Sequence, residues 1–219
     1  FTGPALDVFA DAPEELLRVL GGTENIAQGF LAVLSLTFAF AVSVFAVLSA
    51  QSIRTEETAG RAEPVLAAAV GRTRWLGSHL LVSAVASAGL LLVCGLAIGI
   101  SSAISVGDGD LVGELVLATV AYVPAVWLVL GLAAALYGGL PRLLPLVWVV
   151  VGYGLVVGFF GPLLDLPDGA VQGSPFELVG RAPLEAVSVG GVLLLTLVAA
   201  AAVAAGMALF RRRDVLATG

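Results

Sequence analysis

The chain has 219 residues, of which 59% are hydrophobic and 12% are charged. A soluble globular domain is about half apolar and about a quarter charged, so this composition excludes an ordinary soluble domain and indicates a multi-span membrane protein. The net charge of −6 is less informative, because in a membrane protein the distribution of charge between the two sides matters more than the sum.

Two further features of the composition bear on the source and extent of the chain. All ten basic residues are arginine, which, together with the abundance of Ala, Val, Gly and Leu, is typical of a GC-rich bacterial genome. The chain starts at Phe1 without an initiator methionine, a basic n-region or a cleavage motif. We therefore expect it to start inside a longer polypeptide.

Five apolar stretches are long enough to cross a bilayer, which takes about 20 residues. Apart from His79 and Glu114, each close to one end of its stretch, they contain no Asp, Glu, Lys, Arg or His. The predicted spans cover residues 26–50, 75–106, 111–138, 143–164 and 186–210.

The arginines divide the remaining segments into two groups. Segments 51–74, 139–142 and 211–219 contain eight of the ten arginines. The alternating segments contain Arg18, Arg181 and most of the acidic residues. The positive-inside rule places the arginine-rich group in the cytoplasm. We therefore predict an outside N-terminus, an extracytoplasmic segment over 1–25 and a cytoplasmic tail over 211–219, and we expect at least one preceding span.

The predicted outer segments contain helix signals of their own. Residues 11–22 combine an acidic N-cap candidate, an early proline, an apolar face and a glycine stop, which predicts a short surface helix. In segment 165–185, a turn at 165–169 precedes a possible capping box from Ser174 to Glu177, with Pro175 at the first helical position. We expect a second short helix there.

Most kinds of catalytic chemistry lack the residues they need in this sequence. The chain has one histidine and one cysteine, Cys94, for which packing inside an apolar stretch is the expected role. No Asp, Glu, Lys or Arg lies near the centre of a span, whereas ion-coupled carriers and intramembrane enzymes need polar groups at that depth. The sequence therefore favours an apolar or aromatic pathway for a lipophilic cargo, with energy supplied from elsewhere.

The segment 51–74 is predicted to form a helical elbow between the first two spans. Its first part can continue as helix out of the membrane, Pro64 starts a short second helix, and Gly71 stops it. An elbow lying on lipid is one interpretation, but its three glutamates beside an anionic leaflet favour a protein partner. The charged face consists of Arg54, Glu56, Glu57, Arg61 and Glu63.

The run EETAGRAEPVLAAAVGRTRWLGSHL, from Glu56 to Leu80, resembles a motif of ABC-2-type exporter permeases. The similarity is strongest to the actinobacterial multidrug and polyketide-antibiotic exporter permeases. Matching segments follow at 124–127, 140–142, 174–176 and 210–214. The resemblance implies an all-α transmembrane bundle of the type V exporter class. It also implies a six-span half whose first span is missing here, so that the five predicted spans correspond to the second through sixth.

The same resemblance implies how the protein works. The elbow would be a coupling helix that docks on a separate ATP-binding subunit, present as a dimer, so that ATP and Mg²⁺ are bound by the partner and this chain is not itself an enzyme. A second permease half would complete the membrane part in the bacterial cell membrane. A non-transporting scaffold that anchors a cytoplasmic ATPase is the alternative, and an intramembrane enzyme is disfavoured by the missing polar centre. Nothing in the sequence indicates nucleic-acid binding.

Several residues inside the predicted spans are candidates for a pathway or a packing seam. Phe38 and Phe45 are seven positions apart and share a helix face, so we predict that they line a substrate pathway formed by the first, second and fourth predicted spans, although they could instead face lipid. Phe40 lies on the opposite face. Two GxxxG pairs, at 95–99 and 154–158, could form a dimer or gate seam or could serve ordinary packing. We expect Pro124 and Pro145 to kink or start their helices.

Overall fold

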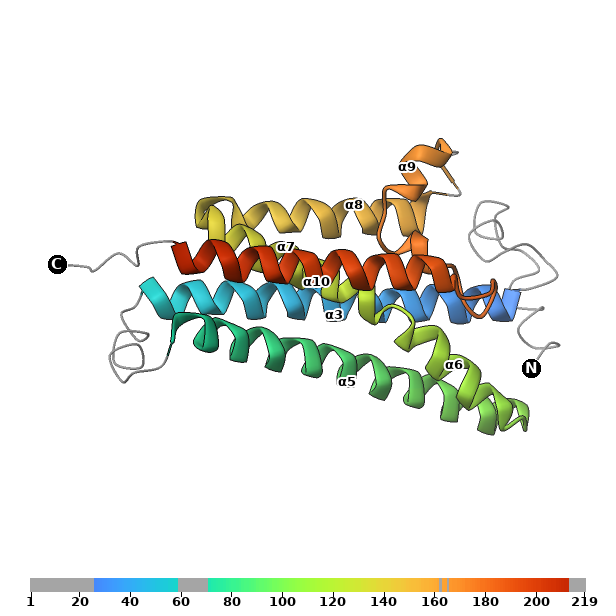
Figure 1. Cartoon of the computed structure of the whole chain (residues 1–219). Helices are drawn as coiled ribbons and strands as arrows, with labels where there is room; N and C mark the ends of the chain where they lie inside the picture. The colour runs from blue at the N-terminus through green and yellow to red at the C-terminus, as the bar shows by residue number, and fades with distance from the viewer. Residues whose placement is uncertain (1–25, 59–70, 162, 165, 213–219) are drawn as a thin grey trace.

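The computed structural model describes residues 26–58, 71–161, 163–164 and 166–212, and within these residues the chain forms helices joined by turns. The predicted surface helix at 11–22 lies outside the described residues. Figure 1 shows long helices lying side by side, with the short ones at the two ends of the bundle. The long helices are α3 (Ile26–Thr58), α5 (Arg72–Val106), α6 (Asp110–Val120), α7 (Val123–Gly139), α8 (Val147–Phe160) and α10 (Val189–Arg212). The short ones are the 3₁₀ helix η1 (Pro141–Leu146), α9 (Asp168–Gln172) and the 3₁₀ helix η2 (Glu177–Val179).

The prediction of five membrane spans is confirmed in the described part of the chain. Five helical segments there are long and apolar enough to cross a membrane, namely Ile26–Thr55, Thr73–Val106, Asp110–Gly139, Pro141–Phe160 and Val189–Arg212. The protein is therefore an all-α, multi-pass membrane protein. As expected for the elbow, α3 continues to Thr58, past the end of its apolar stretch.

The five spans alternate in direction, so the helix ends gather at two opposite ends of the bundle (Figure 1). At one end, here called the arginine end, α3, α7 and α10 finish and α5 begins. At the other, the acidic end, α5 finishes, α6 begins and the segment between α8 and α10 lies. The described arginine end carries Arg54, Arg74, Arg142, Arg211 and Arg212, and the acidic end carries Arg181 together with Asp108, Asp110, Glu177 and Glu185. That the arginine end faces the cytoplasm stays a prediction.

The third span is broken into two helices. Helix α6 ends at Val120 and α7 begins at Val123, with Pro124 in its first turn. At the break the Tyr122 amide bonds to the Thr119 carbonyl over 3.2 Å, a tighter turn than an α-helix makes. Proline has no N–H and cannot bond to the carbonyl four residues before it, so the ladder is interrupted here. The prediction that Pro124 starts a helix is confirmed, and Pro145 lies in η1, directly before α8.

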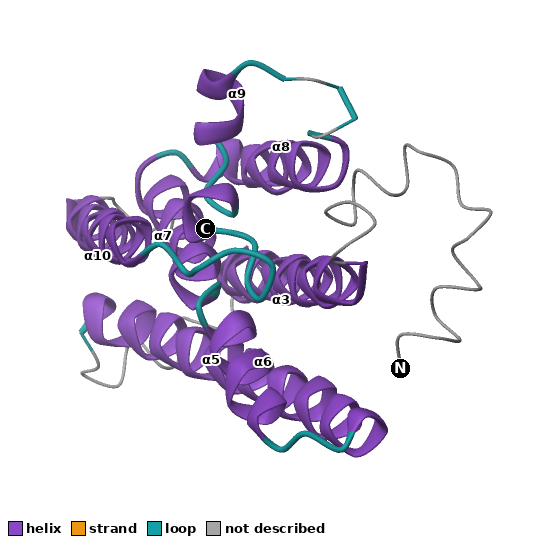
Figure 2. Ribbon diagram, turned by 90° about the vertical axis from the view of Figure 1, so that its right-hand side faces the viewer, coloured by secondary structure: helices purple, strands orange, loops and turns teal. Residues whose placement is uncertain are grey.

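Figure 2 looks onto the acidic end and shows α3, α7 and α10 as a middle layer, with α8 on one side and α5–α6 on the other. Helix α7 is the most buried of the long helices, and α10 packs along it. A side chain at Gly138 would collide with the backbone carbonyl of Gly206, and one at Gly131 would lie 2.8 Å from the Ala199 carbonyl. Small residues therefore bring these two backbones into direct contact, as is common in membranes.

Both predicted GxxxG pairs pack inside the chain. A Cβ added at Gly99 would lie 2.9 Å from the Cα of Val112, so this pair brings α5 close to α6. A Cβ added at Gly158 would lie 2.9 Å from the Leu36 side chain, so the second pair brings α8 close to α3. In this structure the ordinary-packing interpretation accounts for both pairs.

The prediction for the segment between α8 and α10 needs correction. The capping box is wrong: η2 begins at Glu177, not at Pro175, and no side chain caps it. The reason is that the Glu177 carboxylate binds Arg181, while the Ser174 amide donates to the Val171 carbonyl over 3.0 Å. The helix reached from α8 is α9, which begins inside the stretch predicted as a turn.

Two span boundaries also differ from the predicted ones. Helix α8 ends at Phe160 rather than at 164, because the amides of Leu163 and Leu164 both bond to the Phe160 carbonyl in a turn. Helix α10 begins at Val189 rather than at 186, because the Ser188 amide donates to the Val179 carbonyl and holds that residue in the connecting segment.

Candidate functional sites at the two ends of the bundle

Residues 166–188, here called the outer cap, connect α8 to α10 and contact the acidic end of the bundle. Phe176 anchors this cap, because its ring is buried and lies 4.3 Å from the Phe40 ring, centroid to centroid. Gly154 of α8 provides the room, since a Cβ there would lie 2.7 Å from the Phe176 ring. The Phe176 side chain of the cap is thus packed between α3 and α8.

A buried ion pair connects the cap to α8. The Arg181 guanidinium donates to both carboxylate oxygens of Glu177, over 3.0 and 3.2 Å, and donates to the Gly158 carbonyl over 3.4 Å. The Arg181 and Glu177 side chains are only 21% and 10% exposed, so both charges need the pairing that they have. At Gly158 the cap therefore presents a paired arginine to α8 rather than an isolated charge.

A second link joins the cap to the break in the third span. The hydroxyl of Tyr122 donates to the Gly180 carbonyl over 3.2 Å, and the Tyr122 side chain is fully buried. Gly180 has a positive φ of 88°, a conformation that favours glycine and turns the chain at this point. The break and the cap are therefore connected by one hydrogen bond.

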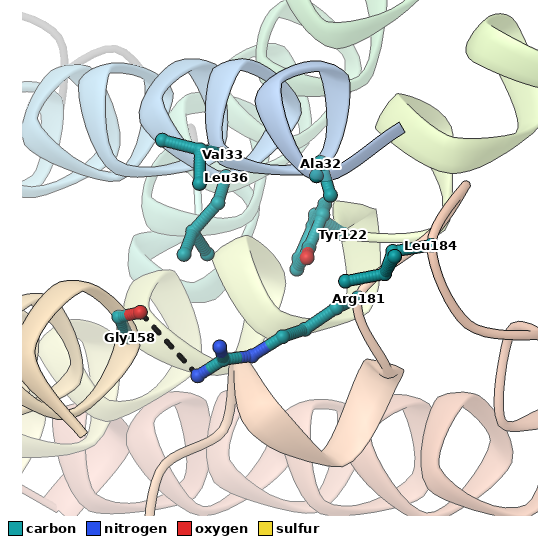
Figure 3. A pocket seen from close by; sticks show the side chains of 8 residues that line it. Ala32, Val33, Leu36, Tyr122, Gly158, Arg181 and Leu184 are labelled. Atoms are coloured by element: carbon teal, nitrogen blue, oxygen red, sulfur yellow. Dashed lines mark hydrogen bonds between the residues drawn. The ribbon is translucent and has the colours of Figure 1, made fainter. Parts of the chain in front are cut away.

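A small pocket lies between these parts, as Figure 3 shows. It has room for roughly one water molecule, whereas a pocket for a drug-sized ligand takes about 300 Å³ or more. This conformation therefore does not admit a drug-sized compound at this position. The pocket is lined by Gly29, Ala32, Val33, Leu36, Tyr122, Gly158, Arg181 and Leu184.

The two phenylalanines predicted to line the pathway lie on α3, away from this pocket. Phe38 is half-buried and Phe45 is 36% exposed, whereas Phe40 is buried against Phe159 and Phe176. The structure thus separates Phe40 from the other two, as the helical period predicts. The role of Phe38 and Phe45 in transport stays a prediction.

At the arginine end, the structure describes the start of the predicted coupling elbow. Arg54 lies on the last turns of α3 and lines an open groove with Gln51, Thr55, Leu144 and Pro145. The side chains of Glu56 and Glu57, which belong to the last turn of α3, and residues Arg61 and Glu63 lie outside the described part. Of the charged face, the structure therefore places the Arg54 side chain alone.

A cluster of aromatic rings, not predicted from the sequence, joins three helices at the same end. The Trp75 ring stacks on Phe210 with centroids 6.3 Å apart, and Phe210 stacks on Tyr137 at 5.5 Å. His79 lies edge-on to Trp75 at 5.1 Å, so its ring packs against the same cluster. The aromatic residues at the arginine ends of three spans were the available signal. The cluster fixes the start of α5 to α7 and α10.

Comparison with known proteins places the chain in a family. Residues 1–211 match the family model described as the C-terminal domain of the multidrug efflux system permease Rv1217c. A curated relative, the multidrug efflux system permease protein Rv1217c of Mycobacterium tuberculosis strain H37Rv, is 34% identical over 206 residues, which cover 93% of this chain. The chain spans 37% of that relative's length. The chain therefore belongs to the family of the C-terminal domain of this multidrug efflux permease.

Proposed function

We propose that this chain is part of the membrane permease of an ATP-driven ABC exporter that moves lipophilic or amphipathic, drug-like compounds out of a bacterial cell. The family membership supports a permease for drug efflux. The observation that carries the ATP-driven mechanism is that α3 continues as helix to Thr58 and that α5 starts at Arg72, both at the arginine end. By the positive-inside rule that end faces the cytoplasm, where ATP is available.

The proposed partner is a separate ATP-binding subunit, acting as a dimer, that binds ATP and Mg²⁺. Residues Arg54, Glu56, Glu57, Arg61 and Glu63 form the proposed docking face. Because α3 is continuous from the membrane to Thr58, a displacement at its end is transmitted as a movement of the whole helix. The elbow also precedes α5 directly, so the same displacement acts on the start of α5. Trp75 at this start is stacked on Phe210, which passes the displacement on to α10.

The proposed cycle is a shift between two populations of conformations. ATP binding closes the partner subunits, the elbow moves, and a cavity opens toward the acidic end, where the outer cap lies. A second permease half and the surrounding lipid complete the cavity. Phe38 and Phe45 are proposed to contact the apolar part of the cargo.

The test is the ATPase activity of the partner subunit, reconstituted in lipid with the full-length permease. Lipophilic compounds should stimulate ATP hydrolysis above its basal rate, and the stimulation should be absent when the partner is reconstituted alone. A membrane scaffold, the alternative function, would bind the ATPase but leave its rate unchanged by such compounds. That result would contradict the proposal.

A further inference from the structure

We propose that the bundle is built as two blocks that move against each other during transport, with the separation running along a seam of buried hydroxyl groups beside α3. One block consists of α5, α6, α7 and α10, here called the four-helix block. The other consists of α3 and α8, here called the two-helix block. This inference rests on the proposed transport function and requires the contacts of α3 with α5, α6 and α7 to open.

The four-helix block is held together by close backbone contacts and ring stacking. Helices α7 and α10 touch at Gly138 and Gly206, and α5 and α6 touch at Gly99, where an added methyl group would not fit. The indole N–H of Trp127 on α7 donates to the Ala84 carbonyl of α5 over 3.1 Å. The stacked rings described above tie α5 to α7 and α10 again at the arginine end. Such contacts resist sliding, because small displacements create overlap.

The two-helix block is held by an aromatic contact. Phe40 of α3 lies 5.8 Å from Phe159 of α8, centroid to centroid, and against Phe176 of the outer cap. Gly158 of α8 accepts the Leu36 side chain of α3 at close range. The cap is therefore attached to this block at Phe176 and to the four-helix block through Tyr122 and α10.

The contact of α3 with α5 and α6 has a different character. Buried hydroxyls on these three helices donate within their own helix: Ser43 to the Ala39 carbonyl (2.8 Å), Ser83 to the His79 carbonyl (2.9 Å), Ser87 to the Ala84 carbonyl (2.9 Å) and Thr119 to the Leu115 carbonyl (2.8 Å). Across the seam, the Oγ atoms of Ser49 and Ser83 lie 2.5 Å apart, and Thr119 Oγ1 lies 3.5 Å from Ser35 Oγ.

This pattern makes the seam easy to separate. In a membrane an unpaired donor is expensive, but a serine that bonds to its own helix keeps its donor satisfied when the neighbouring helix leaves. Since the Ser83 hydroxyl already donates to His79, Ser49 is the donor in the Ser49–Ser83 bond, and it can turn to its own backbone once α3 moves. Separation therefore leaves few unmet hydrogen bonds.

The features found at the two ends of the seam are consistent with a separation of the blocks. Segment 59–70 runs from the end of α3 to the start of α5, so it joins one block to the other, and a force applied to it acts across the seam. At the acidic end, the small pocket lies between α3, Gly158 and Tyr122, which belong to different blocks (Figure 3). Moving the blocks apart widens this pocket.

Disulfide cross-linking in the full-length, Cys94→Ala protein tests the inference. The seam pair Ser49→Cys/Ser83→Cys replaces two oxygens that are already in contact. The control pair Gly139→Cys/Leu209→Cys joins α7 to α10, inside the four-helix block. A Cβ at Gly139 would lie 4.0 Å from the Leu209 Cβ, within the disulfide range of about 3.5–4.5 Å. The probe is ethidium efflux from cells, measured before oxidation, after oxidation and after dithiothreitol.

Oxidation should reduce efflux by the seam pair to the level of cells without the transporter, and dithiothreitol should restore it, while the control pair keeps its efflux throughout. Normal efflux by the oxidised seam pair would overturn the inference. Absence of ethidium efflux by the unsubstituted full-length protein would instead count against the proposed function. In that case the seam is tested by the yield of the disulfide in membranes, compared with and without trapping of the transporter. Trapping with MgATP and vanadate should lower the yield for the seam pair alone, and equal yields in both states contradict the inference.

Discussion

The hydroxyl of Tyr122, at the break in the third span, donates a 3.2 Å hydrogen bond to the carbonyl of Gly180, 58 residues later in the outer cap. This bond joins the interrupted helix to the segment that covers the pocket at the acidic end. It links the break in the third span, where the backbone can bend, to the outer cap, which must open if compounds leave at this end. The first prediction concerns its strength.

Tyr122→Phe should loosen the outer cap without unfolding the bundle. Removing one buried hydrogen bond costs about 1 kcal/mol, which corresponds to roughly fivefold faster opening of the segment it holds. Hydrogen exchange of the amides in residues 176–182 measures this. The comparison variant is Tyr153→Phe, which removes a bond from an exposed hydroxyl to the Ala170 carbonyl in another part of the cap, so it should leave exchange at 176–182 unchanged. If both variants leave exchange in the cap unchanged, the link is not a restraint.

Gly138→Ala should destabilise the protein by about 1–3 kcal/mol, because the added methyl group would overlap the Gly206 carbonyl and push α10 away from α7. Thermal unfolding in detergent of the full-length protein measures the change. Gly152→Ala is the control, since its methyl group meets nothing within 4 Å. Equal melting temperatures for the two variants would show that the α7–α10 contact is looser than the structure has it.

Phe38→Ala together with Phe45→Ala should alter resistance to a panel of lipophilic compounds without loss of expression, because both rings are proposed to contact apolar cargo. Phe30→Ala is the control, since Phe30 is a half-exposed ring on the same helix that is not part of the proposed lining. Resistance that stays unchanged across the panel, or that changes equally in the control, would remove these residues from the pathway.

Cysteines at Asp11 and Asp168, in a Cys94→Ala background, should react with a membrane-impermeant thiol reagent in intact cells, whereas a cysteine at Thr55 should react only after the cells are opened. The reason is the arginine asymmetry, which places residues 1–25 and 165–185 outside. Labelling is read by mass shift. Reaction at Thr55 in intact cells would invert the topology.

The spans could be predicted from sequence because their apolar composition and length decide membrane insertion almost alone. The break before Pro124 could be predicted for an equally local reason, the missing amide of proline. The α7–α10 contact could not be predicted. Gly131 and Gly138 lie seven residues apart on α7 and Gly206 lies on α10, so their contact depends on which spans become neighbours. The capping box failed because Arg181, four residues further along the chain, binds the Glu177 carboxylate instead.

The candidate sites divide in the same way. That Phe40 points away from Phe38 and Phe45 followed from the helical period, but its position between Phe159 and Phe176 depends on the return of the chain after α8. The serines along α3 and α5 carried no sequence signal, because isolated serines in apolar runs are common in membrane helices. Their hydrogen bonds within each helix became visible only in the structure.

The central claim, that ATP-driven export acts through the elbow, is tested most directly by ATP-dependent accumulation of a lipophilic dye in inside-out vesicles that contain the full-length permease and its ATP-binding subunit. The charge-reversed variants Glu57→Arg and Arg61→Glu should insert normally and lose accumulation, whereas Arg142→Glu, at an exposed arginine of the same end outside the elbow, should keep it. Full accumulation by a double variant carrying both elbow reversals would contradict the account.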